Sequence, residues 1–249
     1  MSELPEIDIV AELKKLFIKG YVRSLRGSDT GIGYTLETLL KIKENNSGEP
    51  DFKYRGIPVE LKSQREDASS RITLMTKTPN WNPLSPKAII KKFGYRDCEG
   101  RLALKITLTA TDFNPKGFKL EVDKKSDRLN IVHKDYGIVA YFEVKELMRK
   151  LSDKIYENLI LVLADRKKRG KSEYFKYRKA ILLQELSEDA FEQLFTDGSI
   201  VWEFRMHLKE NGGVRDHGPG FRISRDKLSK LYSKVKVIFD GSRLSEEQK

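Results

Sequence analysis

Apolar and polar residues alternate along the middle of the chain. Between 102 and 108 every second residue is leucine or isoleucine, which is the period of a half-buried strand. Three more segments, 118–122, 128–133 and 138–142, are rich in β-branched, aromatic and aliphatic residues and are separated by turns containing Gly, Asn or Asp. Strands spaced in this way predict an antiparallel meander.

Other segments have the spacing of helices or of isolated strands. Apolar residues three and four positions apart predict helices at 5–19, 36–43, 87–93, 143–151, 187–195 and 224–232. Strands are expected at 59–62, 71–77, 158–164, 200–208 and 235–239, followed by a tail from Gly241. The run 158–164 is apolar throughout, as in a central strand buried on both faces. The mixture predicts an α/β protein.

Length and charge narrow the class of protein. The 249 residues can bury one large α/β core or a core with an additional lobe, and the second arrangement is favoured. Lys and Arg total 48 against 37 acids, a net charge of +11, which predicts a polyanionic partner. Nucleic acid is the leading candidate. A membrane surface is the competing one, but we find neither a basic amphipathic helix with an aromatic-rich apolar face nor an apolar run of transmembrane length.

Cysteine and histidine are too few for a soft-metal site. The chain has one cysteine, Cys98, and three scattered histidines, so an internal disulfide is excluded and a zinc site is disfavoured. A metal would instead be held by oxygen ligands, for which Mg²⁺ is the simplest choice. The acidic N-terminus lacks the features of a secretory signal, and we expect a cytoplasmic protein.

The stretch 49–62 carries the strongest candidate chemistry. Glu60 and Lys62 lie two positions apart on a predicted strand and therefore project on the same side. If Asp51 lies on the neighbouring strand of a hairpin that turns at Gly56, two carboxylates converge and can hold a divalent cation. The Lys62 ammonium can then orient an attacking water and offset the charge that develops on phosphorus. An ordinary solvated strand has the same pattern, so this triplet alone leaves both interpretations open.

The spacing resembles that of a known nuclease family. Asp51, Glu60 and Lys62, with Glu37 upstream in a helical pattern, resemble the MutH-like branch of the PD-(D/E)xK nucleases, and within it the MvaI-like type II restriction endonucleases, which are similar to BcnI. The resemblance implies a mixed central sheet flanked by helices with a β-rich DNA-recognition lobe. It implies that Glu37 joins the two carboxylates at the metal. Lys105 would be a further active-site lysine on a strand next to Glu60, although a surface position explains it better.

The same resemblance implies an activity and a division of the chain. The activity is Mg²⁺-dependent cleavage of double-stranded DNA at CC(A/T)GG by a monomer, one strand at a time, with a cognate DNA methyltransferase expected genetically and not as a bound partner. A MutH-type nickase, a junction resolvase and a non-catalytic DNA-binding module remain as alternatives. The expected division is 1–110 and 140–185 for the catalytic core, 111–139 for the meander, and 186–249 for the recognition lobe.

Three basic segments are candidate DNA contacts. The glycine-containing loop 21–33 and the run 165–171 have the composition of segments that grip the phosphate backbone, although both also have that of solvated loops. The glycine-rich segment 210–222 combines Arg and Asp, whose side chains read guanine and cytosine edges in the major groove. The resemblance adds residues near 65–71. The expected DNA-binding residues are Arg23, Arg26, Arg65, Arg71, Lys167, Lys168, Arg169, Arg215, Asp216, His217, Arg222 and Arg225.

Overall fold

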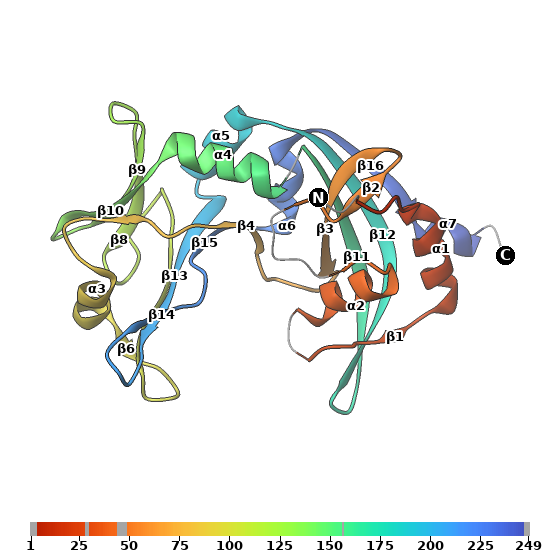
Figure 1. Ribbon diagram of the computed structural model, residues 1–249, viewed down its shortest axis with the longest axis horizontal. Helices are drawn as coiled ribbons and strands as arrows, with labels where there is room; N and C mark the ends of the chain where they lie inside the picture. Colours follow the sequence, from red (N-terminus) through yellow and green to blue (C-terminus); the bar gives the residue numbers. More distant parts are fainter. Residues whose placement is uncertain (1–3, 28–29, 44–48, 156, 247–249) are drawn as a thin grey trace. The chain divides into compact units, whose positions relative to one another are not determined.

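The chain folds into two compact units, each built from separate segments (Figure 1). Unit 1 comprises Met1–Ser70, Ser152–Leu186 and Tyr232–Lys249, and unit 2 comprises Arg71–Leu151 and Ser187–Leu231. The computed structural model describes residues 4–27, 30–43, 49–155 and 157–246. No helix in these ranges is long and apolar enough to cross a membrane.

Unit 1 contains a mixed six-stranded sheet. Its path is β1-β12-β11-β3-β2, with β16 also pairing with β12. Strands β3 and β11 run parallel, whereas the other neighbours are antiparallel. The mixed sheet that the family resemblance implies is therefore confirmed. The strands are β1 (Val22–Arg23), β2 (Phe52–Tyr54), β3 (Ile57–Arg65), β11 (Asn158–Arg169), β12 (Ser172–Leu186) and β16 (Tyr232–Asp240).

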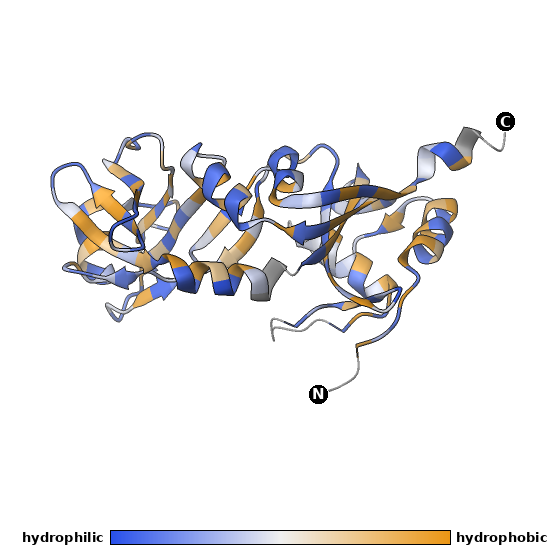
Figure 2. Cartoon of the chain, turned by 90° about the horizontal axis from the view of Figure 1, so that it is seen from above, coloured by the Kyte–Doolittle hydropathy of each residue, from blue (hydrophilic) through white to orange (hydrophobic). Residues whose placement is uncertain are grey.

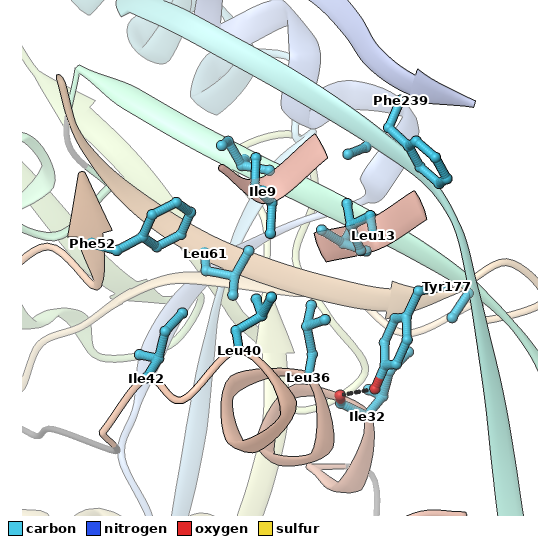
Figure 3. Packing of buried hydrophobic residues seen from close by; sticks show 14 of the residues in the cluster. Ile9, Leu13, Ile32, Leu36, Leu40, Ile42, Phe52, Leu61, Tyr177 and Phe239 are labelled. Atoms are coloured by element: carbon cyan, nitrogen blue, oxygen red, sulfur yellow. Dashed lines mark hydrogen bonds between the residues drawn. The ribbon is translucent and has the colours of Figure 1, made fainter. Parts of the chain in front are cut away.

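Helices α1 (Ile9–Lys19) and α2 (Gly31–Leu39) contribute buried side chains to the hydrophobic core of unit 1. Helix α1 begins where the Asp8 side chain accepts a hydrogen bond from the Ala11 N–H, an N-cap that starts the helix later than the predicted residue 5. Figure 3 shows side chains of α1 and α2 packed with Leu61 of β3. The buried Tyr177 hydroxyl donates to the Ile32 carbonyl at 2.8 Å. Helix α7 (Gly241–Glu246) lies where a tail was expected.

Helix α2 begins five residues earlier than its apolar pattern predicts. The helix includes Gly31, and a Cβ atom at that position would lie 2.4 Å from the Arg26 carbonyl oxygen and 2.6 Å from the Ser24 hydroxyl. Only glycine permits so close an approach of the preceding loop. Gly31 and Gly33, which fall within the loop predicted at 21–33, instead belong to the first turn of the helix.

Strand β11 is the buried central strand that the apolar run predicts. Every residue from Leu159 to Ala164 is 5% exposed or less. The strand then continues through the basic run as far as Arg169, turns at Gly170 (φ 59°) and returns as β12. The run is thus the end of a long hairpin. Interpreting 165–171 from its charge alone misses both this hairpin and β12.

Unit 2 is built from two antiparallel sheets. One has the order β5-β10-β9-β8, and the other has the order β4-β15-β13-β7-β6 with β14 also pairing with β13. Hydrophobic and hydrophilic residues interchange along its strands (Figure 2), and Trp202, Phe204 and Phe142 pack edge to face in its interior. The strands are β4 (Ile72–Thr76), β5 (Asn80–Trp81), β6 (Tyr95–Arg96), β7 (Leu102–Leu108), β8 (Phe118–Asp123), β9 (Arg128–His133), β10 (Gly137–Glu143), β13 (Ile200–Leu208), β14 (Val214–Asp216) and β15 (Gly220–Ile223). Its helices are α3 (Pro86–Phe93), α5 (Glu188–Thr196) and α6 (Arg225–Leu228), together with most of α4 (Val144–Ile155), whose last residues belong to unit 1.

The two units divide the chain differently from the expected division. Residues 71–110 and 140–151 pack with the meander in unit 2, and residues 232–246 pack in unit 1. The reason is pairing between distant strands, because β7 pairs with β13 and β16 pairs with β12. Sequence order alone does not reveal these long-range pairs. The glycine-rich segment also contains two short strands, β14 and β15.

Candidate active site and DNA-contact residues

A tight hairpin places Asp51 opposite Glu60. Arg55 (φ 53°) and Gly56 (φ 77°) both adopt left-handed conformations between β2 and β3, as a two-residue type I′ turn requires. In the resulting register Phe52 faces Val59, and the Asp51 N–H donates to the Val59 carbonyl at 3.0 Å. The turn at Gly56 and the hairpin position of Asp51 are as the sequence predicts.

The Asp51 carboxylate is fixed by the backbone of the neighbouring strand. Its Oδ2 accepts a hydrogen bond from the Leu61 N–H at 2.7 Å. Burial raises the pKa of Asp51, while the Leu61 N–H and the positive charge of Lys62 act in the opposite direction. A desolvated carboxylate gains strongly from a bound cation, because little water competes for its oxygens.

Glu60 and Lys62 project together from β3. Their side chains form an ion pair and are 15% and 29% exposed, respectively, whereas Val59 and Leu61 are buried in the core. The negative charge of Glu60, together with burial as the larger cause, raises the pKa of the Tyr232 hydroxyl. Asp51, Glu60 and Lys62 therefore share one side of the β2–β3 hairpin.

Glu37 comes from helix α2 and not from the β2–β3 hairpin. A Cβ atom at Gly33 of α2 would lie 3.5 Å from the Ser63 hydroxyl and 3.7 Å from Glu37 Oε1, so Gly33 is adjacent to both groups. Because side chains alternate along a strand, Ser63 points to the opposite side of β3 from Glu60 and Lys62. Glu37 also raises the pKa of buried Tyr177, after the larger effect of burial.

The described part of the chain contains no ready-made set of three metal ligands. Within it, no group of three or more His, Cys, Asp or Glu side chains is placed to hold a metal ion, so Glu37, Asp51 and Glu60 are not gathered in this structure. The donor chemistry still fits a hard divalent cation at Asp51 and Glu60, since both supply carboxylate oxygens on one side of the hairpin.

A second feature of unit 1 is a basic cavity of about 520 Å³. It brings together four of the predicted DNA-binding residues from three segments, because β1 pairs with β12 and β3 pairs with β11. The structure adds Arg166, Lys171 and Glu173, which the residue-by-residue prediction did not include. The residues lining the cavity are Arg23, Ser24, Leu25, Arg26, Gly27, Arg65, Arg166, Lys168, Gly170, Lys171, Ser172 and Glu173.

Alternation along β11 divides its basic residues between two environments. Arg166 and Lys168 line the cavity. The Lys167 ammonium lies over the Tyr21 ring, 4.3 Å from its centroid, and the Arg169 guanidinium lies 5.7 Å from the centroid of Tyr174. Such cation–π contacts hold the two side chains against the strand surface. The consecutive basic residues in the sequence do not by themselves show which of them line the cavity.

In unit 2, the predicted base-reading segment is anchored by two histidines. Arg215 and Asp216 lie on β14, which pairs with the end of β13. His217 follows and its Nε2 lies 2.9 Å from Nδ1 of His207. Desolvation is the largest cause that lowers the pKa of each histidine, and this favours the neutral form, in which two imidazoles can share one N–H···N hydrogen bond.

Arg222 on β15 faces an acid. Its Nε lies 3.2 Å from Glu203 Oε2, with both side chains 19% exposed. Burial lowers the pKa of Arg222, and the charges of Arg205 and Arg71 add to this effect. Glu203 and Arg205 were missed in the sequence because polar residues at alternate positions of β13 are typical of any half-buried strand. Arg225 is the first residue of α6.

Lys105 lies on a strand that does not pair with the strand carrying Glu60 and Lys62. It belongs to β7 of unit 2, and its ammonium lies 3.6 Å from Asp97 Oδ2. The strands that pair with β3 are β2 and β11. The interpretation of Lys105 as an active-site lysine on a neighbouring strand is therefore wrong, because the alternating pattern of β7 does not specify which sheet the strand joins.

Comparison with known proteins identifies the family of this chain. The model of the MvaI/BcnI restriction endonuclease family matches residues 10–232. A solved structure described as a complex of restriction endonuclease MvaI with its cognate DNA substrate is 28% identical, with a TM-score of 0.75, and the match covers 92% of this chain and 96% of that one. Restriction endonuclease MvaI in the absence of DNA is also 28% identical, with a TM-score of 0.53 and coverage of 93% and 98%. The curated proteins include no match.

The family match extends over most of the chain and includes both units. It spans the hairpin with Asp51, Glu60 and Lys62, the basic cavity and the segment around Arg215. The sequence resemblance to MvaI-like enzymes is thereby confirmed. The chain belongs to the MvaI/BcnI restriction endonuclease family and is a site-specific deoxyribonuclease.

Proposed function

We propose that this enzyme is a Mg²⁺-dependent type II restriction endonuclease that hydrolyses double-stranded DNA at CC(A/T)GG, one strand at a time. The observation that carries the proposal is the convergence of Asp51, Glu60 and Lys62 on one side of the β2–β3 hairpin. The target sequence is carried over from the resemblance to MvaI-like enzymes. Arg215 and Arg222 are consistent with a target rich in G·C pairs, because one arginine side chain can donate two hydrogen bonds to a guanine.

The residues of the hairpin have separate roles in this proposal. Asp51 and Glu60 would hold the cation, which supplies Lewis-acid chemistry at the scissile phosphate when it is bound. The Leu61 N–H keeps the Asp51 carboxylate in position. Lys62, whose ammonium pairs with Glu60, would orient the attacking water and offset negative charge in the transition state.

Binding of the duplex is divided between the units. Cations of unit 1, including Arg23, Arg26 and Lys168, contact phosphates without reading sequence. Arg215, Asp216 and Arg222 of unit 2 read base edges. Glu37 supports the site from α2, where its carboxylate lies next to Gly33, a residue that is also adjacent to Ser63 of β3.

Digestion of a supercoiled plasmid with one CC(A/T)GG site tests the proposal. We expect open-circle DNA to accumulate before linear product, since one chain supplies one catalytic hairpin for two scissile phosphates of opposite polarity. Sequencing of the ends should place the cuts within the target. Ends at unrelated sequences would reject the specificity. Linear product without an open-circle intermediate, formed at a rate rising steeply with enzyme concentration, would show that two chains act together, and nicked product alone would indicate a nickase.

A further inference from the structure

Glu173 places a carboxylate among the cations of the basic cavity. Its Oε1 lies 3.5 Å from Arg166 Nη1, 3.8 Å from Lys168 Nζ and 3.9 Å from Arg65 Nη1. The side chain is 21% exposed, and Glu173 is the sole acid among the residues that line the cavity in the described part of the chain.

The three distances are longer than those of a tight, charge-assisted hydrogen bond, which measures about 2.7–2.9 Å. One oxygen therefore balances the charge of several cations without binding any of them closely. Arg166 also has a separate partner, because its Nη2 lies 2.8 Å from Asp67 Oδ2. The Arg166 side chain is therefore held in position by Asp67 as well as by Glu173. An anion with more oxygen acceptors than a carboxylate would use the cations better.

The size and composition of the cavity fit a phosphate group. A volume of about 520 Å³ exceeds the space that the Glu173 carboxylate fills, and Arg23, Arg26 and Lys171 add further positive charge to the lining. Arginine donors suit the tetrahedral oxygens of a phosphate.

We propose that this cavity binds a backbone phosphate of duplex DNA and that Glu173 occupies the anion position until DNA displaces it. The identity of the ligand rests on the proposed function. In the free enzyme the Glu173 carboxylate partly neutralises the positive charge of the cavity. When DNA binds, this carboxylate must turn away, or it is repelled by the negative phosphate. Glu173 thereby lowers affinity for DNA of any sequence, so that productive binding depends on the base contacts of unit 2.

The test is equilibrium binding of a short non-cognate duplex, without metal, at several salt concentrations. Glu173→Gln should bind about threefold to tenfold more tightly at low salt, with a salt dependence steeper by about one released ion. Glu185→Gln is the matched control. It removes the same charge from the same strand, β12, where Glu185 pairs with Lys234, and it should behave as wild type.

Two further arms make the result decisive. Arg166→Gln should weaken binding of the same duplex and flatten its salt dependence. If Glu173→Gln fails to fold, this variant alone tests whether the cavity binds a DNA phosphate. At matched ionic strength, inorganic phosphate and a mononucleotide should not displace the duplex. Displacement by either, equal effects of Glu173→Gln and Glu185→Gln, or an unchanged salt dependence in Arg166→Gln would overturn the proposal. Tighter binding by Glu173→Gln in a protein that cuts no CC(A/T)GG duplex in Mg²⁺ would support the cavity and reject the proposed function alone.

Discussion

Lys62→Ala is expected to abolish cleavage of duplex DNA while specific binding survives. The ammonium lies beside Glu60 and acts on the charge of Asp51, so its removal takes positive charge from the place where the transition state becomes more negative. We expect single-turnover cleavage to fall at least about 100-fold. Binding should change little, because the duplex is held mainly by cations elsewhere in the chain.

The two quantities should be measured on one cognate oligonucleotide, by quenched-flow cleavage and by gel shift in Ca²⁺. Asp51→Ala and Glu60→Ala should behave like Lys62→Ala, and Glu37→Ala should lose less activity. Lys15→Ala is a suitable control, because this lysine is exposed on α1 and pairs with Glu12. Cleavage by Lys62→Ala at the wild-type rate would refute the assignment of the site.

Arg215→Ala is expected to reduce discrimination between DNA sequences. Arg215 lies on β14 and is exposed, next to the His207–His217 hydrogen bond that anchors this short strand. A guanidinium that binds one guanine at two positions contributes about 1–3 kcal/mol to discrimination against another base. The variant should lose about this much affinity for cognate DNA and little for a duplex with a substitution at the base it reads.

Lys168→Ala is the matched comparison, since Lys168 lines the basic cavity of unit 1. Loss of a phosphate contact should weaken all duplexes similarly and reduce their salt dependence. The measurement is affinity for the cognate duplex and a set of single substitutions at several salt concentrations. Equal losses of Arg215→Ala on every duplex would exclude Arg215 as a base reader.

Local patterns predicted the elements of this protein better than their assembly. Period-two alternation located β7 and the β8–β10 meander, and the apolar run located β11, because burial of one or both strand faces dictates these patterns directly. The same patterns do not specify which strands pair. The alternative that put Lys105 on a strand next to Glu60 is consequently wrong, whereas its exposed side chain agrees with the favoured surface position. The division of the chain into units also differed from the expected one.

The candidate site followed the same rule. Asp51, Glu60 and Lys62 converge because a two-residue turn fixes the register of the β2–β3 hairpin, and Gly56 indicates that turn in the sequence. The position of Glu37 depends on how α2 packs on β3, where Gly33 is adjacent to Ser63. No spacing in the sequence predicts this packing. Glu173 has no signal of its own, since it joins the basic cavity only through the pairing of β12 with β11 and β1.

The dependence of cleavage on a divalent cation tests the central claim most directly. Single-turnover cleavage of a cognate duplex should be absent in excess EDTA, rise with Mg²⁺ to a plateau, and remain absent in Ca²⁺ although binding persists, because catalysis requires stricter cation geometry than association. In Asp51→Ala no concentration of Mg²⁺ should restore the plateau. Full cleavage by the wild-type enzyme in EDTA, or a normal Mg²⁺ response in Asp51→Ala, would contradict the account of the β2–β3 hairpin as the metal-dependent active site.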